Sequence, residues 1–378
     1  MPGLPGTVRL LQAILIFHLL PVRRVTPDAA GSAAITLAVP ANLLETFDFR
    51  PGQFLTLRAS IDGLETRRSY SICSPHQRYA QSLEIDIGIK PVESGTFSRW
   101  ALAQLVPGKT IDVMPPDGRF TPRVAGARHR VGFAAGSGIT PLLSIIASTL
   151  AGQTDSSFTL VYGNQRVNTI MFNEALQDLK DRYPARLTLF HLLSRQPHEL
   201  ALLQGRLDQA KVGELLRTVL PAAGIDEAFI CGPEGMIEAT QRALLAAGLA
   251  PERLHSERFF AAGSSVATKT IAAHAHSTRT TSQNDLKIRL DVVLDGKTYH
   301  LNMGPTDRVL DVALEAGLDL PYSCRGGVCC TCRAQVLEGK MEMVKNYTLE
   351  PWEIDSGFVL TCQARARTER VVLSYDAR

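Results

Sequence analysis

The stretch Cys324-Arg-Gly-Gly-Val-Cys-Cys-Thr-Cys332 places four thiols in one loop, and Cys362 follows after a gap of 29 residues. When Cys330 is left out, the spacing is Cys-x4-Cys-x2-Cys with a distant fourth cysteine, which is the spacing of plant-type 2Fe–2S clusters. Two irons bridged by two sulfides need four thiolates, and one tight loop supplies three. Gly326 and Gly327 allow unusual backbone angles and bring amides near the sulfides. The pattern predicts a cluster held by Cys324, Cys329, Cys332 and Cys362.

The alternative for this loop is a structural zinc site. Zinc usually takes two close cysteine pairs, and only one such pair is present here. Cys330 adds a further thiol, but its use in place of Cys329 would break the spacing, so we expect Cys330 not to be a ligand. The chain has seven cysteines, an odd count unlike that of a short secreted disulfide scaffold.

The residues around the loop have the pattern of a small α+β domain. From Asp285 onward, apolar and charged side chains alternate with the period of a half-buried strand. Asp295–Gly296 predicts a hairpin turn. A short helix is expected from Val309 to Ala316, ending at Gly317. We therefore expect residues 285–378 to form the domain that holds the cluster.

A segment without apolar periodicity precedes this domain. Residues 261–284 are rich in Ala, Ser and Thr and predict a linker. His274 and His276 lie in it, and we expect them to be solvated rather than to bind a metal.

Strands alternate with longer helical stretches over residues 126–260, which predicts a doubly wound α/β domain with a parallel sheet. The helical stretches include Leu142–Leu150 and Met171–Leu179. The expected strands are the apolar runs Arg130–Ala135, Phe158–Tyr162, Leu187–Leu193 and Ala228–Cys231. Such sheets bind ligands at the carboxyl ends of their strands.

Distinctive residues follow the first and last of these strands. Gly136–Ser137–Gly138 allows a ligand to approach the backbone closely. Thr140 suits a helix N-cap and Pro141 the first helical position. This is not the full G-x-G-x-x-G pattern, and alone it would be a weak signal. Because Cys231–Gly232–Pro233 also ends a strand, the shared position predicts a nicotinamide nucleotide site.

Ser194 and Arg195 stand at the end of the third strand of this domain. Arginine pairs well with phosphate, so the two residues suit the 2′-phosphate of NADPH. No acidic residue stands there to hold a free ribose diol, which favours NADPH over NADH. A surface arginine without this role is the alternative.

Residues 17–125 have the pattern of an antiparallel β-barrel. Between Leu83 and Lys90 apolar residues alternate with charged or small ones, the period of a half-buried strand. Pro-Gly turns recur, as at Pro51–Gly52 and Pro107–Gly108. Many short strands with turn signals predict a small barrel.

Two segments of this barrel suit a flavin. Arg68–Ser69–Tyr70–Ser71 supplies a cation for a pyrophosphate, an aromatic face for the ring, and a small hydroxyl near the reactive nitrogen. Gly95–Thr96–Phe97–Ser98 opens a helix whose backbone amides would face a phosphate. Each segment alone is weak, because a strand arginine is usually a surface charge and a strand tyrosine usually packs.

At this order and spacing, the two flavin segments resemble the ferredoxin–NADP reductase superfamily. The order of flavin barrel, nicotinamide domain and plant-type ferredoxin resembles oxygenase reductases, in particular the reductase subunits of phenylacetyl-CoA epoxidases. The matching stretches are Arg68–Cys73, Ala134–Pro141, Tyr162–Asn164, Phe229–Pro233, Glu257–Phe259, Asn346–Glu350 and Gly357–Gln363. The stretch from Asn346 to Gln363 is the one more particular to these subunits.

The resemblance implies a β-grasp fold for the C-terminal domain and FAD, rather than FMN, in the barrel. It places Cys231 beside the nicotinamide and Phe259 among the cofactor-binding residues. It also implies catalytic roles for Tyr70, Ser71, Cys231 and Glu257. A flavin accepts two electrons and releases them singly, so the expected path runs from NADPH through FAD and the cluster to an oxygenase.

The expected partner is a separate set of diiron epoxidase subunits that act on phenylacetyl-CoA. A reductase of the same architecture could instead serve a Rieske-type ring hydroxylase or a steroid hydroxylase. A non-catalytic redox carrier or sensor is a further alternative, against which the intact flavin and nicotinamide motifs argue.

The totals fit a soluble multidomain enzyme expected in the cytoplasm. The length of 378 residues suits two or three domains, and a net charge of +3 without a basic stripe does not suggest nucleic acid. The apolar run Leu10–Val22 is too short to cross a membrane. We expect residues 1–16 to be an extra N-terminal tail, with a signal or interfacial anchor as the alternative.

Overall fold

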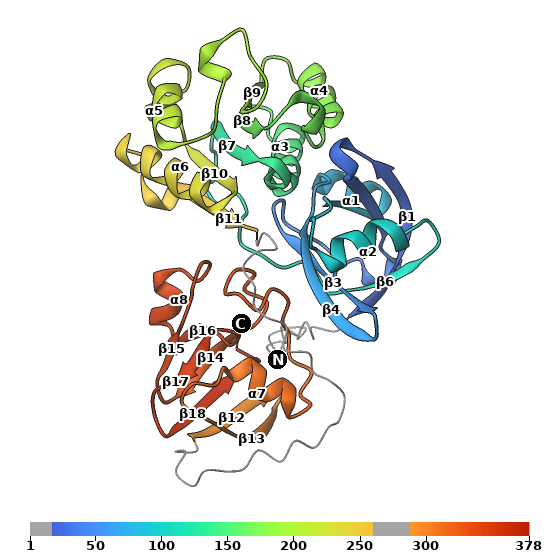
Figure 1. The fold of residues 1–378 in the computed structure, drawn as a ribbon, viewed down its shortest axis with the longest axis vertical. Helices are drawn as coiled ribbons and strands as arrows, with labels where there is room; N and C mark the ends of the chain where they lie inside the picture. The colour runs from blue at the N-terminus through green and yellow to red at the C-terminus, as the bar shows by residue number, and fades with distance from the viewer. Residues whose placement is uncertain (1–16, 260–287, 378) are drawn as a thin grey trace, which may run out of the picture.

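The computed structural model describes residues 17–259 and 288–377, which form three parts, each built around its own sheet (Figure 1). The expected tail at 1–16 and linker at 261–284, with His274 and His276, lie outside the described residues. Within those residues, no helix combines the length and apolar composition needed to cross a membrane.

The N-terminal part is a curled antiparallel sheet with the strand order β4-β3-β6-β1-β2-β5. A bridge between Ile72 and Ile87 joins its two ends, so the sheet closes into the expected barrel. Two helices accompany it, α1 (His76–Ser82) and α2 (Thr96–Gln104). The strands are β1 (His18–Pro27), β2 (Ala33–Ala38), β3 (Phe54–Ile61), β4 (Leu64–Ser71), β5 (Glu84–Ile89) and β6 (Thr110–Val113).

One expectation for the barrel is wrong: strand β5 does not alternate between buried and exposed residues. Asp86 and Gly88, expected on a solvent-facing side, are both buried. A side chain at Gly88 would meet Thr140 Cγ2 at 2.5 Å and Phe172 Cζ at 2.9 Å. The second part of the chain therefore covers this face. Asp86 is satisfied there by Arg78, whose Nη1 donates to it at 2.5 Å.

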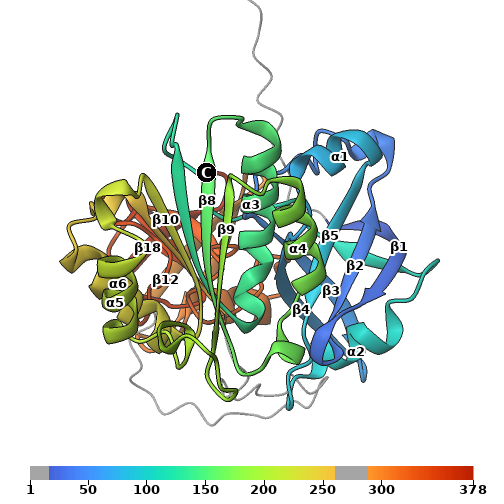
Figure 2. The same cartoon turned by 90° about the horizontal axis from the view of Figure 1, so that it is seen from above.

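The middle part is a five-stranded parallel sheet of order β11-β10-β7-β8-β9. Its strands are β7 (His129–Ala135), β8 (Ser157–Asn164), β9 (Leu187–Leu193), β10 (Glu227–Gly232) and β11 (Leu254–Arg258). Its helices are α3 (Ile139–Gly152), α4 (Asn173–Arg182), α5 (Gln209–Thr218) and α6 (Glu234–Ala246). Helices α3 and α4 cover one face and α5 and α6 the other, as Figure 2 shows, which confirms the doubly wound fold.

Two helix starts differ from expectation. Helix α3 begins at Ile139 with Gly138 as N-cap, so neither Thr140 nor Pro141 holds its expected position. The preceding 3₁₀ turn runs directly into the helix, and Thr140 Oγ1 instead donates to the Ser137 carbonyl at 3.0 Å. Helix α4 begins after Phe172, whose φ of 58° lies in the left-handed region, two residues later than Met171.

The C-terminal part has a five-stranded sheet of order β13-β12-β18-β14-β16 and a two-stranded sheet β15-β17. The Asp295–Gly296 hairpin is confirmed, with φ values of 52° and 72° that suit a type I′ turn. Helix α7 (Val309–Glu315) packs on the sheet, and α8 (Pro351–Asp355) follows later. The strands are β12 (Ile288–Leu294), β13 (Lys297–Met303), β14 (Arg333–Glu338), β15 (Met341–Met343), β16 (Phe358–Leu360), β17 (Ala364–Ala366) and β18 (Arg370–Ser374).

Candidate electron-transfer site

The four cysteines of the predicted cluster lie together. The loop from Cys324 to Cys332 leads into β14, and Cys362 follows β16. The Cys324 thiol lies within hydrogen-bonding reach of the thiols of Cys329 and Cys362, and Cys362 lies within reach of Cys332. The amides of Gly326 and Cys329 each donate to Cys324 Sγ at 3.4 Å. Four adjacent thiols, with amides directed at sulfur, fit a 2Fe–2S cluster.

The packing of the loop explains why a glycine stands at position 327. Gly327 has a φ of 81°, and a Cβ on it would lie 2.9 Å from the Lys345 carbonyl oxygen. The loop is therefore pressed against the segment after β15 with no room for a side chain.

Over residues 17–259 and 288–377, no three His, Cys, Asp or Glu side chains converge as ligands of a single ion would. A two-iron cluster makes a different demand, since each iron takes two thiolates.

Cys330 contacts a different neighbour. Its Sγ lies 2.8 Å from Thr348 Oγ1, in the segment before α8. The residue is buried and has a φ of 60°, while burial raises the pKa of its thiol to about 11. The contact with the Thr348 hydroxyl directs the Cys330 thiol toward the segment before α8.

Strand β4 presents the predicted flavin residues on alternating faces. Arg68 is exposed and donates to the Arg67 carbonyl at 2.7 Å. The half-buried Tyr70 ring lies 5.9 Å from the Phe97 ring, and burial raises the pKa of its hydroxyl. Ser69 and Ser71 point to the opposite face, because side chains alternate along a strand.

The other flavin segment surrounds the start of α2. Gly95 is the N-cap residue, and a Cβ on it would lie 2.8 Å from Val92 Cβ. The Phe97 side chain is buried in the barrel core, and Ser98 Oγ accepts from the Val92 amide at 3.1 Å. With Thr96 exposed, this segment would offer a phosphate its backbone amides and the Thr96 hydroxyl.

Ser71, Cys231 and Glu257 meet where the barrel touches the parallel sheet. Ser71 Oγ donates to Glu257 Oε2 at 3.3 Å. Cys231 and Glu257 are register partners on β10 and β11. Burial raises the pKa of the Glu257 carboxyl to about 8, although the Ser71 hydrogen bond opposes the shift. Burial, reinforced by the Glu257 charge, also raises the pKa of the Cys231 thiol.

The Gly136–Ser137–Gly138 turn lies directly on this point. A Cβ at Gly138 would come within 2.1 Å of the Cys231 carbonyl oxygen, so only glycine fits there. At Gly232, a Cβ would lie 2.8 Å from Met236 Cε, and Pro233 is the exposed N-cap of α6.

Ser194 and Arg195 lie at the carboxyl edge of β9, next to the end of β8. The Ser194 amide donates to the Asn164 carbonyl at 2.9 Å, and the Arg195 amide donates to the Gln165 carbonyl at 2.9 Å. The Arg195 side chain is exposed at this edge. Phe259, directly after β11, is also partly exposed, at 37%.

A cavity of about 390 Å³ lies where the three parts of the chain meet. Its walls include Phe54 and Gly118 of the barrel, Glu257 of the parallel sheet and Cys329 of the cysteine loop. One space therefore connects the Ser71–Glu257 pair to a predicted cluster ligand. A flavin ring between a nicotinamide and a cluster would need such a connection.

Sequence reasoning missed several residues of this cavity. Arg119, Arg123 and Arg258 line it, as does the segment from Asn346 to Pro351. The Arg258 guanidinium lies 5.4 Å from the Tyr347 ring centroid, and its Nε is buried without a hydrogen-bond partner. The available signals were the likenesses of the Asn346–Glu350 and Glu257–Phe259 stretches, which assigned no role to these residues.

A barrel, a doubly wound nucleotide-type domain and a four-cysteine domain around one cavity define a modular flavin and iron–sulfur reductase. Family models agree. An oxidoreductase FAD-binding domain matches residues 26–121, an oxidoreductase NAD-binding domain 133–242, and a 2Fe-2S iron-sulfur cluster binding domain 292–367.

Two full-length relatives narrow the class. The chain is 42% identical to one subunit of the 1,2-phenylacetyl-CoA epoxidase of Escherichia coli (strain K12), over 96% of this chain and 98% of the relative. It is 33% identical to the ferredoxin reductase component of 3-ketosteroid-9-alpha-monooxygenase from Rhodococcus rhodochrous, over 94% of this chain and 96% of the relative. The solved phthalate dioxygenase reductase has the same fold, with a TM-score of 0.55, 20% identity, and coverage of 95% of this chain and 98% of that one.

The chain belongs to the family of oxygenase reductases that includes this 1,2-phenylacetyl-CoA epoxidase subunit. It is an NAD(P)H-dependent oxidoreductase that uses FAD and a 2Fe–2S cluster and serves an oxygenase. The expected cofactor classes and three-domain fold are thereby confirmed. The residues assigned to each cofactor stay predictions.

Proposed function

We propose that this chain passes electrons from NADPH, through FAD and the 2Fe–2S cluster, to diiron epoxidase subunits that act on phenylacetyl-CoA. The observation that carries the choice of partner is the 42% identity to the Escherichia coli epoxidase subunit, across nearly the whole of both chains. Cysteines that hold a cluster rather than form disulfides suit a reducing compartment, so we place this work in the cytoplasm.

The barrel would hold the flavin, which when bound takes up a hydride and releases its electrons singly. Arg68 would pair with the pyrophosphate, together with the amides that follow Gly95. Tyr70 would present its ring face to the flavin ring. Ser71 would direct its hydroxyl at the reactive edge of that ring, near Glu257.

The parallel sheet would hold NADPH at the carboxyl edge of its strands. Ser194 and Arg195 would bind the 2′-phosphate, and the Gly136–Ser137–Gly138 turn would let the pyrophosphate approach the backbone. Cys231 would lie beside the nicotinamide. Since the Glu257 carboxyl has a pKa of about 8, it can hold a proton near neutral pH and exchange it through the Ser71 hydroxyl.

Cys324, Cys329, Cys332 and Cys362 would hold the cluster, with Cys329 facing the shared cavity. The cavity supports a direct path, because the same space borders Glu257 and this cysteine. Cys330 is left out of the ligand set, since its thiol contacts Thr348.

The partner is tested by reconstitution. The purified chain is mixed with epoxidase subunits, phenylacetyl-CoA and NADPH, and epoxide formation is measured by mass spectrometry. We expect NADPH oxidation coupled to product. The oxygenase component of a 3-ketosteroid monooxygenase is the matched comparison, because a relative from that system aligns over 94% of this chain. Turnover of the steroid system with none of the epoxidase would reject the proposed partner.

A further inference from the structure

Two arginines of the barrel part reach the C-terminal part on either side of the cysteine loop. The first is Arg67 on β4, which is only 5% exposed. Its Nη2 donates to Asp319 Oδ1 at 2.9 Å and its Nη1 to the Leu320 carbonyl at 3.1 Å. Its guanidinium also lies 4.2 Å from the Tyr322 ring centroid. These contacts hold the segment that runs directly into Cys324.

The position of Arg67 on its strand gives this contact a meaning. Arg68 and Tyr70, which would bind the pyrophosphate and the ring of the flavin, lie on one face of β4, and Arg67, Ser69 and Ser71 lie on the other. Ser69 Oγ is 2.8 Å from Ser323 Oγ, next to the first cluster cysteine. One strand therefore carries Arg68 and Tyr70 on one face and holds the cluster-bearing part through Arg67 and Ser69 on the other.

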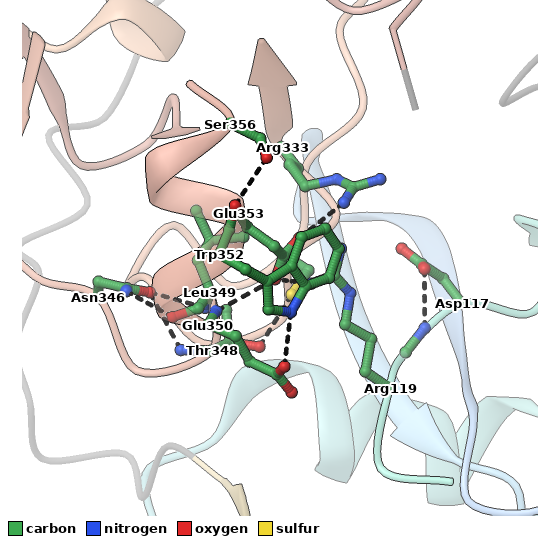
Figure 3. Close-up of polar contacts among 12 residues, drawn as sticks. Asp117, Arg119, Arg333, Asn346, Thr348, Leu349, Glu350, Trp352, Glu353 and Ser356 are labelled. Atoms are coloured by element: carbon green, nitrogen blue, oxygen red, sulfur yellow. Dashed lines mark hydrogen bonds and ion pairs between the residues drawn. The ribbon is translucent and has the colours of Figure 1, made fainter. Parts of the chain in front are cut away.

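The second arginine is Arg119, on the segment that leaves the barrel. It forms an ion pair with Glu353 of α8, whose side chain is fully buried (Figure 3). The Glu353 carboxylate also accepts from Arg333, which directly follows Cys332, at 2.7 Å. A buried carboxylate between two arginines thus ties the far end of the cysteine loop to the barrel.

The segment that carries Arg119 makes hydrogen bonds with the barrel, the parallel sheet and the C-terminal part. Asp117 and Phe54 exchange backbone hydrogen bonds of 2.8 and 3.0 Å. The Arg123 amide donates to Glu227 Oε1 of β10 at 2.7 Å, and Arg123 Nη1 reaches Glu350 at 2.6 Å. Arg119 therefore lies on a connecting segment that contacts all three parts of the chain.

We propose that Arg67 and Arg119 are positioning residues for electron transfer, which dock the ferredoxin domain (residues 288–377) with its cysteine loop facing the flavin strand. The proposal rests on the flavin-to-cluster path of the proposed function and names the residues that set its geometry. The Glu353 side chain is fully buried, so its ion pair with Arg119 is screened little by salt, whereas Arg67 is buried but its partner Asp319 is exposed. Loss of Arg67 removes the arginine partner of Asp319, and loss of Arg119 leaves the buried Glu353 carboxylate with Arg333 alone, so either loss weakens the docked state.

The test uses the holoenzyme with Arg67→Met, Arg119→Met and the double substitution. Arg58→Met is the matched control, because Arg58 is the register partner of Arg67 on β3 and pairs within the barrel, with Asp112 and Glu65. Anaerobic rapid mixing with NADPH follows flavin reduction and cluster reduction at separate wavelengths. Ferricyanide accepts electrons from the flavin, and cytochrome c accepts them from the cluster. The rates at which these two acceptors are reduced are compared.

We expect flavin reduction to stay within about twofold of wild type, whereas cluster reduction falls about tenfold or more in the double variant. Cytochrome c reduction should fall in parallel, while ferricyanide reduction and iron content stay unchanged. Cluster reduction at the wild-type rate would overturn the proposal. An equal loss in both assays would also overturn it, because that result indicates a purely structural role.

Two further variants keep the proposal testable if the Met variants do not fold. Asp319→Asn removes only the charge on the exposed partner of Arg67, and Arg119→Lys retains a cation opposite Glu353. Each should slow cluster reduction less than the matching Met variant, and equality with wild type in both would reject the proposal. If the wild-type chain itself showed no reduction of flavin or cluster by NADPH, the proposed function would fail first.

Discussion

The cysteine loop and the Ser71–Cys231–Glu257 site differ in how the chain builds them. The loop draws three of its four predicted ligands from the stretch between Cys324 and Cys332, so its chemistry is written in local spacing. The other site joins three strands, and its Ser71–Glu257 hydrogen bond spans 186 residues. A local site can be derived from spacing and valence, whereas an assembled site becomes visible only after folding. Cys362→Ala and Glu257→Gln test these two regions, and Arg195→Ala tests the choice of nucleotide.

The largest effect is expected from Cys362→Ala, which removes the ligand that the loop itself does not supply. A missing thiolate leaves one iron without its second protein ligand, so we expect the cluster signal and cytochrome c reduction to be lost entirely. Flavin-dependent ferricyanide reduction should remain. Cys330→Ala is the matched control and should retain the cluster, measured by iron content and EPR. Loss of the cluster from the control would show that the spacing was interpreted wrongly.

Glu257→Gln tests the assembled site and should have the next largest effect. We expect flavin reduction by NADPH to slow by roughly a hundredfold, the usual scale for loss of a proton-transferring group. The slow rate should also lose the dependence on pH near 8 that the raised carboxyl pKa gives the wild type. Rapid mixing at several pH values measures both. A variant with the wild-type rate and pH profile would remove Glu257 from the mechanism.

The same carboxyl makes stability depend on pH. Folded Glu257 holds its proton up to about pH 8, while an unfolded glutamate releases it near 4.5. Between these values the folded state binds more protons, so the free energy of unfolding falls as pH rises, by at most about 1.4 kcal/mol per pH unit. The Gln variant should lack this slope in denaturant titrations.

Arg195→Ala should have the smallest effect and bears on the choice of nucleotide. Loss of a charge-assisted contact with the 2′-phosphate should raise the KM for NADPH by about tenfold, because a contact made by the exposed Arg195 side chain lies near the lower end of the range of roughly 1.5–3 kcal/mol. The KM for NADH should change little. Steady-state kinetics with both nucleotides measure this. An equal rise for both would assign Arg195 a role other than phosphate recognition.

The sequence predicted the elements whose signals are local. Four of the five strands of the parallel sheet, the Asp295–Gly296 hairpin and the helix ending before Gly317 were found, because each depends on periodicity or on one turn. The fifth strand, β11 (Leu254–Arg258), was not among the expected strands. The start of α3 was misplaced, since a 3₁₀ turn through Gly136–Ser137–Gly138 replaces a side-chain cap. The buried face of β5 was missed, because a neighbouring domain covers it.

The docking residues show the same limit. Arg67 and Arg119 have no special sequence context, and their partners, Asp319 and Glu353, lie more than 200 residues away. Only the fold brings these charges together. Glu353 does lie within the stretch from Asn346 to Gln363, in which Cys362 alone had an assigned role. The ion pair with Arg119 gives part of that stretch a physical purpose.

The central claim is that one chain carries electrons from NADPH through FAD to the cluster that Cys324, Cys329, Cys332 and Cys362 hold. Anaerobic titration of the purified protein with NADPH, followed by optical spectra and EPR, tests it most directly. We expect bleaching of the flavin and an EPR signal of a reduced 2Fe–2S cluster, with two electrons taken by the flavin and one by the cluster. Flavin bleaching without any cluster signal, or no bleaching by NADPH, would contradict it.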